Sequence, residues 1–139
     1  MKIAILNGPN LNMLGKRNPA YYGQMTLDEL DNYIDQTFID VDFIFFQTNH
    51  EGQMIDFLQS QQFDGLVINA GAYTHTSIAL RDALESIDKI KVEVHLSNIY
   101  ERETFRKVNY IKDVVDASFF GKKAQSYVEA ITYILEKLS

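Results

Sequence analysis

The sequence predicts an α/β fold in which helices cover both faces of a parallel sheet. Short apolar runs alternate with longer segments whose apolar residues recur every three or four positions, as in parallel strands joined by helical crossovers. With 139 residues, 46% hydrophobic and 23% charged, the chain is expected to form one domain, residues 1–139, with a sizeable core. Unusual polar residues follow several of the apolar runs, where such sheets bind ligands.

The first strand is predicted over Lys2–Asn7, where four apolar residues follow one another as in a strand buried on both faces. A long irregular loop, residues 7–22, comes next and is closed by Gly23. Both prolines and three of the seven glycines lie in it or at its end, so neither a helix nor a central strand can run through it. A loop this long in a compact domain is usually functional or disordered. Its tyrosines, lysine and arginine favour a functional loop over a solvated one.

Two stretches carry the capping-box pattern of a helix start, in which a threonine hydroxyl and a glutamate three residues later satisfy free N–H groups. Thr26 and Glu29 form the first pattern, and apolar residues at helical spacing follow it. Thr48 and Glu51 form the second and predict another helix. A strand rich in Phe and Ile, residues 41–47, is predicted between the two helices.

The second half of the chain repeats this alternation and ends, after Gly121, in a long helix. That closing helix is expected to bury one apolar stripe, made of Ala124, Tyr127, Val128, Ile131, Leu135 and Leu138. A polar, turn-rich stretch, residues 98–112, precedes the last strand. The predicted strands cover residues 2–7, 41–47, 65–69, 91–97 and 114–119.

Right-handed crossovers between these units give the flavodoxin-like fold, which has three layers and a five-stranded parallel sheet with the order 2-1-3-4-5. In such sheets ligands bind beyond the carboxyl ends of the strands, where the order reverses between strands 1 and 3. The unusual polar residues fall at these ends: Asn10, Arg17 and Tyr22 after strand 1, Asn69 and His75 after strand 3, and His95, Ser97, Arg102 and Arg106 at or after strand 4.

Composition and charge exclude several classes of protein. The chain has no cysteine, which excludes disulfides and thiolate metal sites. Its formal charge of −6 and its scattered basic residues argue against a nucleic-acid partner, whereas an anionic small substrate needs only a few arginines at one site. No apolar run is long enough for a signal peptide or a membrane span, so we expect a cytoplasmic protein without a membrane partner.

The fourth predicted strand places Glu93, His95 and Ser97 on one face. Both faces of a strand inside a parallel sheet are normally apolar, so this polar face needs an explanation. One interpretation is that it meets solvent or another subunit. The other is a general acid, in which Glu93 fixes the tautomer of His95 and stabilises its imidazolium form.

The other histidines are less distinctive. His75 lies just before a helix, either in an incidental capping segment or beside N–H groups that suit hydroxyls or an anion. His50, at the start of the second helix, is expected to be structural or to support other site residues rather than to contact a ligand. The three histidines lack the spacing of metal ligands, so we predict no metal.

Tyr22 and Arg17 form an unusual pair in the first loop. A free tyrosine has a pKa of about 10, so tyrosine acts as a base near neutral pH only where cations stabilise the phenolate. Arg17, helped by Arg106, could supply that field. Taken alone, Tyr22 is more often a packing residue that closes a loop, and Tyr21 is a weaker candidate.

Five blocks of sequence resemble the type II 3-dehydroquinate dehydratases. A lone Gly-Pro-Asn would be a weak signal, but these blocks are collinear, span almost the whole chain and fall at predicted strand ends. They comprise residues 7–15, 17–23, 47–52, 69–83, and 93–98 together with 102–106.

The resemblance implies a lyase of the shikimate pathway of aromatic amino acid biosynthesis. Its reaction removes water from 3-dehydroquinate, by anti elimination through an enolate, to give 3-dehydroshikimate. The resemblance assigns Tyr22 as the base, supported by Arg17, and His95 as the acid, oriented by Glu93. It assigns Asn10 as the oxyanion donor, acting through an ordered water. The substrate carboxylate is assigned to Asn69 and the backbone of Leu96 and Ser97, and the ring hydroxyls to His75 and Arg106.

The resemblance also bears on cofactors and assembly. It implies no cofactor and no metal, because the base, the acid and the oxyanion donor are side chains or water. Family members form trimers grouped into dodecamers, and Asp82 matches an aspartate that a neighbouring subunit contributes to the pocket. Residues 17–24, flanked by Gly15 and Gly23, would form a lid that closes on the substrate and excludes water.

Three features depart from the family pattern. Asn18 stands where an acidic residue is usual, Ala70 stands where proline is common, and the link over residues 38–41 is shorter than usual. None of them touches a proposed catalytic group, so they bear on the lid, the turn after strand 3 and assembly rather than on the reaction.

Other functions fit the sequence less well. A flavin- or phosphate-binding module needs a glycine- and hydroxyl-rich loop after strand 1, which Pro9 and Leu11 do not supply. A phospho-accepting signalling domain needs carboxylates where this chain has Asn7 and Asn69. A catalytically inactive homologue that binds a small acid is the remaining alternative.

Overall fold

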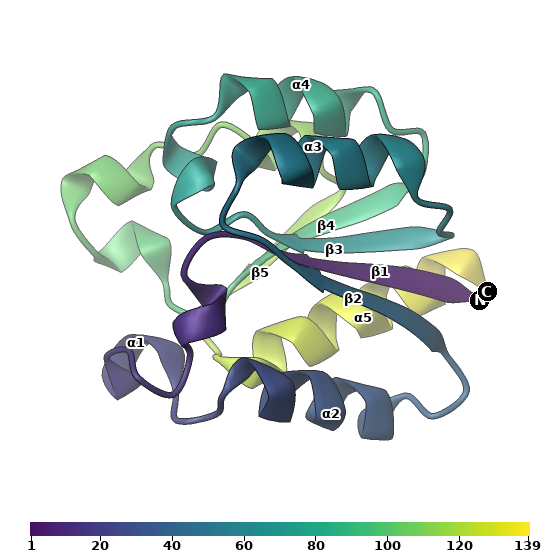
Figure 1. Ribbon diagram of the computed structural model, residues 1–139, viewed down its shortest axis with the longest axis horizontal. Helices are drawn as coiled ribbons and strands as arrows, with labels where there is room; N and C mark the ends of the chain where they lie inside the picture. The colour runs from purple at the N-terminus through teal and green to yellow at the C-terminus, as the bar shows by residue number, and fades with distance from the viewer.

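A computed structural model describes residues 1–139 and confirms the predicted architecture (Figure 1). Its parallel sheet has five strands in the order β2-β1-β3-β4-β5. Helices α3 and α4 cover one face, and α2 and α5 cover the other. The strands are β1 (Lys2–Asn7), β2 (Asp42–Gln47), β3 (Gly65–Asn69), β4 (Ile90–His95) and β5 (Ala117–Phe120). The helices are α1 (Pro19–Tyr22), α2 (Leu27–Thr37), α3 (Glu51–Ser60), α4 (Ile78–Glu85) and α5 (Ala124–Leu138).

Alternate residues of the inner strands enter two separate cores. Ile3 and Ile5 of β1 pack on the side of α2 and α5, whereas Ala4 and Leu6 pack on the side of α3 and α4. All four are fully buried, which explains why this strand reads as an unbroken apolar run. No helix is both long and apolar enough to cross a membrane.

Only the first of the two predicted capping boxes forms. Thr26 Oγ1 accepts a hydrogen bond from Glu29 N at 3.2 Å, and Glu29 Oε1 accepts one from Thr26 N at 3.1 Å. The second prediction is wrong, because α3 begins only at Glu51 and its N-cap, His50, makes no side-chain cap. Thr48 Oγ1 instead accepts from His50 N at 3.1 Å.

The closing helix buries a stripe that differs from the predicted one. Tyr127 and Ile131 are buried as predicted, but Leu138 is 39% exposed, and Ala130 and Ile134 lie at the centre of the buried face. The lack of a side chain at Gly65 makes room for Ile134, since a Cβ there would lie 2.6 Å from Ile134 Cγ2. The position of α5 against the sheet therefore depends on a glycine in β3.

Short helical turns occupy segments that were predicted as loops. The four-residue α1 lies in the loop after β1, because Pro19 suits the first helical position and Asn18 Oδ1 accepts from Ala20 N at 3.0 Å. Asn18 thus caps this helix. The remaining turns are 3₁₀ helices: η1 (Leu11–Met13), η2 (Gly71–His75), η3 (Ile99–Glu101), η4 (Thr104–Lys107) and η5 (Lys112–Val114).

The other two departures from the family pattern are accommodated locally. Ala70 has a φ of −74°, which is in the range that proline adopts, so the backbone after β3 has a conformation that is compatible with either residue. The short link before β2 closes in a tight turn, in which Val41 N donates to Phe38 O at 3.1 Å.

Candidate active site

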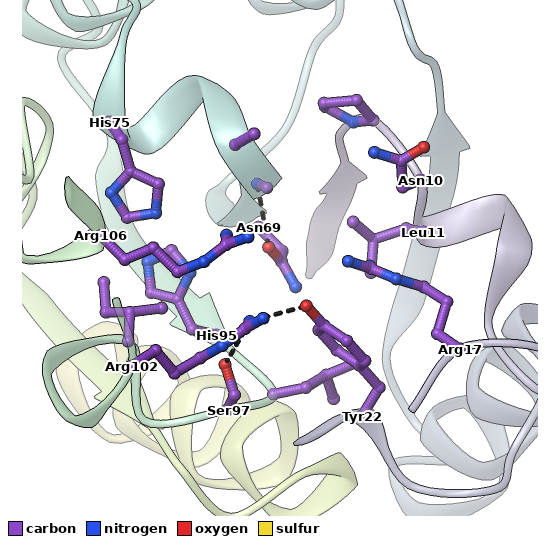
Figure 2. Close-up of a pocket in the computed structure, with 15 residues that line it drawn as sticks. Asn10, Leu11, Arg17, Tyr22, Asn69, His75, His95, Ser97, Arg102 and Arg106 are labelled. Atoms are coloured by element: carbon purple, nitrogen blue, oxygen red, sulfur yellow. Dashed lines mark hydrogen bonds between the residues drawn. The ribbon is translucent and has the colours of Figure 1, made fainter. Parts of the chain in front are cut away.

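A polar pocket lies at the carboxyl ends of β1, β3 and β4 (Figure 2). Its empty space, together with the open solvent at its mouth, amounts to about 540 Å³. Nine of the eleven predicted site residues line it: Asn10, Arg17, Tyr22, Asn69, His75, His95, Leu96, Ser97 and Arg106. Pro9, Leu11, Gly71, Ala72, Ile99 and Arg102 complete the lining.

The loops after β1 and β3 lie unusually close together at this pocket. Gly8 N donates to Asn69 O at 2.7 Å, and a Cβ on Gly8 would lie 2.7 Å from Ala70 O. Only glycine fits this approach. The contact brings Asn10 and Asn69, from two separate loops, to one cavity.

His95 and Glu93 form a buried pair behind the pocket. The two side chains extend from the same face of β4, and His95 Nε2 lies 3.0 Å from Glu93 Oε2. Glu93 is 1% exposed and His95 is 5% exposed, so this polar face of β4 does not meet solvent. Burial by itself raises the pKa of Glu93, but hydrogen bonds from His95, Ser118 and Asn109 outweigh it and lower the pKa below its usual value.

An ionised Glu93 determines the state of the His95 ring. A carboxylate only accepts hydrogen bonds, so Nε2 must carry the proton shared with Glu93. No protein group hydrogen-bonds to Nδ1. This nitrogen is therefore left to act on a molecule in the pocket, as a general acid requires.

Tyr22 contacts two guanidinium groups, one at its ring and one at its hydroxyl. The Arg17 guanidinium carbon is 3.7 Å from the centroid of the Tyr22 ring, and Arg102 Nη1 donates to the Tyr22 hydroxyl at 2.6 Å (Figure 2). Sequence reasoning named Arg17 and Arg106 as the supporting cations and did not include Arg102 in the site. Its position after strand 4 was the available signal, since that strand end also supplies Arg106.

Arg17, Arg102 and Arg106 line the pocket, and no acidic side chain lines it. Burial lowers the pKa of Arg17, and the nearby charges of Arg102 and Arg106 lower it further, whereas Tyr22 opposes the change. Glu103 pairs with Arg106 Nε at 2.9 Å and with Arg102 Nε at 3.5 Å, from outside the pocket lining. The cavity therefore suits an anionic ligand.

Asn69 is fixed by a buried network that sequence reasoning missed. Its Oδ1 accepts from Gly71 N at 3.1 Å, and its Nδ2 donates to the Tyr127 hydroxyl at 2.9 Å. The Tyr127 hydroxyl in turn donates to Asn7 Oδ1 at 2.5 Å. Tyr127 was predicted only as a core residue, and its helical spacing gave no signal of the polar contact.

His75 and Asn10 lie on opposite sides of the pocket (Figure 2). His75 Nδ1 is 2.6 Å from Val108 O, so Nδ1 donates and Nε2 is an acceptor. Burial lowers the pKa of His75, and the nearby positive charge of Arg106 adds to this effect. Asn10 has a left-handed φ of 71°, and its backbone N donates to Asn49 Oδ1 at 3.0 Å.

Two predicted site residues do not line the pocket: Glu93, which lies behind it against His95, and Asp82. Asp82 lies on the exposed side of α4, outside the lining of its own chain's pocket. Nowhere in residues 1–139 do three or more His, Asp or Glu side chains come close enough to hold a metal ion together.

The chain is similar to known proteins over almost its whole length. The family model described as "Dehydroquinase class II" matches residues 1–135. The chain is 47% identical over 138 residues to the 3-dehydroquinate dehydratase of Thermotoga neapolitana, covering 96% of this chain and 94% of that protein. It is 46% identical to that of Geotalea daltonii, covering 99% of each. It is similar to the crystal structure of type II dehydroquinase from Butyrivibrio crossotus, with a TM-score of 0.93 and 41% identity over 96% of this chain and 97% of that one.

Proposed function

This chain belongs to the dehydroquinase class II family, and from that membership we propose that it dehydrates 3-dehydroquinate to 3-dehydroshikimate, by anti elimination through an enolate, in the shikimate pathway. The observation that carries the proposal is that Tyr22 and His95 line the same pocket. A base and an acid that act on one small molecule must share a cavity.

Tyr22 removes the proton from the carbon beside the ketone of the substrate. Its phenolate is supported by Arg102 Nη1, at 2.6 Å from the hydroxyl, and by the Arg17 guanidinium over the ring. Negative charge then moves to the ketone oxygen, giving the enolate. Asn10, through an ordered water, donates to that oxygen, and such preorganised donors commonly contribute several kcal/mol.

His95 completes the elimination. When the enolate collapses, the carbon–oxygen bond of the hydroxyl two carbons from the ketone carbon breaks, and the leaving oxygen takes a proton from His95 Nδ1 to depart as water. Glu93, 3.0 Å from Nε2, stabilises the imidazolium form that supplies this proton. The Tyr22 proton returns to His95 through solvent after product release, which restores both groups.

The remaining pocket residues bind the substrate. Asn69 and the backbone of Leu96 and Ser97 hold its carboxylate, and the fixed amide of Asn69 is oriented for this by Gly71 and Tyr127. His75 and Arg106 bind the ring hydroxyls. His75 Nε2 is the acceptor nitrogen, because Nδ1 donates to Val108 O.

An ultraviolet assay tests the function directly. Mixed with 3-dehydroquinate, the purified protein should produce the absorbance of the conjugated enone product, at the same rate with and without a chelator. A folded protein that binds the substrate but never forms the enone would support the alternative of an inactive small-acid-binding homologue. Loss of rate with the chelator would refute the metal-independent mechanism.

We also propose that neighbouring subunits complete the site in trimers grouped into a dodecamer. The supporting observation is that Asp82 is exposed and lies outside its own chain's pocket. Mixing inactive Tyr22→Phe chains with Asp82→Ala chains should restore part of the activity, because some sites then receive both native residues. Absence of restoration in proven mixed oligomers would exclude the shared site. A cytoplasmic location stays a prediction.

A further inference from the structure

Two residues other than His95 also donate hydrogen bonds to the Glu93 carboxylate. Ser118 Oγ donates to Glu93 Oε1 at 2.6 Å. Asn109 Nδ2 lies 2.9 Å from Oε1 and 3.2 Å from Oε2. With His95 Nε2 on Oε2, both oxygens of a carboxylate that is 1% exposed are satisfied.

These donors come from two different parts of the chain. Ser118 stands opposite Glu93 in the register of β4 and β5. Asn109 lies between η4 and η5, and its Oδ1 accepts from Ile111 N at 2.9 Å and from Lys112 N at 3.0 Å. Because Oδ1 is occupied by the backbone, the NH₂ group of Asn109 has to face Glu93. Neither residue lines the pocket.

We propose that Ser118 and Asn109 are positioning residues, which hold the Glu93 carboxylate so that Oε2 accepts from His95 Nε2 and His95 Nδ1 faces the pocket. A carboxylate held only by His95 could rotate or shift, and the ring would follow it. Fixing the outer partner of a histidine sets both its tautomer and its orientation. The catalytic part of this inference rests on the proposed role of His95 as the acid.

The Ser118 hydroxyl offers the cleanest test. Ser118→Ala removes the donor, Ser118→Thr keeps it on a residue that suits a strand, and Ser60→Ala is a matched control on α3, where the hydroxyl donates only to Asp56 O. We expect Ser118→Ala to lower kcat about five- to tenfold with KM nearly unchanged, which is the scale of one ordinary hydrogen bond, because Asn109 and His95 still hold the carboxylate. Ser118→Thr should restore kcat, and Ser60→Ala should not change it.

Two further measurements separate positioning from general destabilisation. In a Glu93→Gln background, Ser118→Ala should lower kcat no further, because its effect passes through the carboxylate. Long-range ¹H–¹⁵N spectra of the neutral ring, assigned by loss of the His95 signals in His95→Asn, should show protonated Nε2 in the native protein and a mixture of tautomers in Ser118→Ala. An unchanged kcat and tautomer in Ser118→Ala, or the same loss of kcat in the Glu93→Gln background, would overturn the inference.

The spectra also distinguish the two proposals. They require no substrate, so they test the positioning of His95 even if the protein does not dehydrate 3-dehydroquinate. Conversely, a native tautomer pattern combined with full activity of His95→Asn would remove His95 as the acid and leave the positioning intact.

Discussion

Arg102 Nη1 lies 2.6 Å from the Tyr22 hydroxyl, although the two residues are 80 positions apart in the chain. The hydrogen bond joins the loop after β1 to the segment after β4. It places the permanently charged guanidinium group of Arg102 next to the phenol oxygen that we propose as the base. The Arg102 guanidinium carbon lies 4.2 Å from the centroid of the Tyr21 ring, so both tyrosines of the loop after β1 contact one arginine.

We expect Tyr22→Phe to abolish turnover while leaving the fold intact. The substitution removes only the oxygen that takes the proton, and general bases typically contribute 10²- to 10⁴-fold to the rate. Tyr21→Phe is the matched control, because the Tyr21 hydroxyl makes no hydrogen bond and its ring is retained. Near-native kcat in Tyr22→Phe, measured by enone absorbance, would eliminate tyrosine as the base.

We expect Arg102→Met to lower kcat about ten- to a hundredfold, because a hydrogen bond to a developing phenolate is worth roughly 1.5–3 kcal/mol. Arg102→Lys should retain part of the rate, since it keeps the charge but not the planar geometry. Lys16→Met is the control: Lys16 is an exposed cation of the same loop that does not line the pocket. Equal rates for Arg102→Met and the native protein would show that Arg17 stabilises the Tyr22 phenolate without help from Arg102.

His95→Asn should lose about 10²- to 10⁴-fold in kcat at the elimination step, because asparagine cannot supply the proton. His50→Asn is the matched control, since His50 is exposed at the N-cap of α3, where asparagine is also favourable. Single-turnover rates report the step itself. If His95→Asn keeps its rate while Tyr22→Phe loses it, the acid is a different group.

Asp31 should make the protein less stable as the pH rises. Burial, followed by repulsion from Asp28, raises the pKa of this half-buried carboxyl group to about 6, and its Oδ1 has no hydrogen-bond partner. Because the folded state holds the proton more tightly than the unfolded state, whose pKa is about 3.9, the free energy of unfolding falls between about pH 4 and pH 6 and stays lower above that.

Asp31→Asn should therefore raise the free energy of unfolding above pH 6 by about 1 kcal/mol, a value discounted for the partial exposure of the carboxyl group. At pH 3 the gain should vanish. Asp35→Asn, at an exposed position of the same helix, controls for the change in net charge. Urea unfolding at a series of pH values provides the measurement, and a gain that is independent of pH would contradict the assignment.

Tyr127→Phe should lower the free energy of unfolding by about 2–3 kcal/mol, because it leaves the buried Asn7 Oδ1 and Asn69 Nδ2 without their partner. Tyr133→Phe, on the same helix, should have little effect, since the Tyr133 hydroxyl makes no hydrogen bond in the structure. Equal urea midpoints for the two variants would show that the network contributes nothing to stability.

The fold was predictable because local patterns and the overall arrangement agree. The apolar run in β1, the capping box at Thr26 and the alternation of strands and helices each point to the same sheet. The order of the strands then brings Asn10, Asn69 and His95 together at one edge. The match of five sequence blocks to one family is the source of the roles that we propose for these residues.

What the sequence did not predict depends on contacts between distant segments. The hydrogen bond from Arg102 to Tyr22 needs the positions of two loops, and no periodicity encodes them. Tyr127 has the spacing of a core residue, and its polar partners, Asn7 and Asn69, lie at the ends of two distant strands. Its hydrogen bonds therefore could not be predicted without the position of α5 against the sheet. The failed capping box at Thr48 shows that a short motif cannot by itself locate the first residue of a helix.

The crowding of Arg17, Arg102 and Arg106 has a practical consequence for the choice of buffer. Guanidinium groups gathered at one pocket repel one another, and a small doubly charged anion relieves that repulsion without resembling the substrate. Phosphate and sulfate should therefore compete with substrate at low ionic strength, and they should also raise the melting temperature. Kinetics measured in phosphate buffer would consequently give an apparent KM that is raised by competition from phosphate.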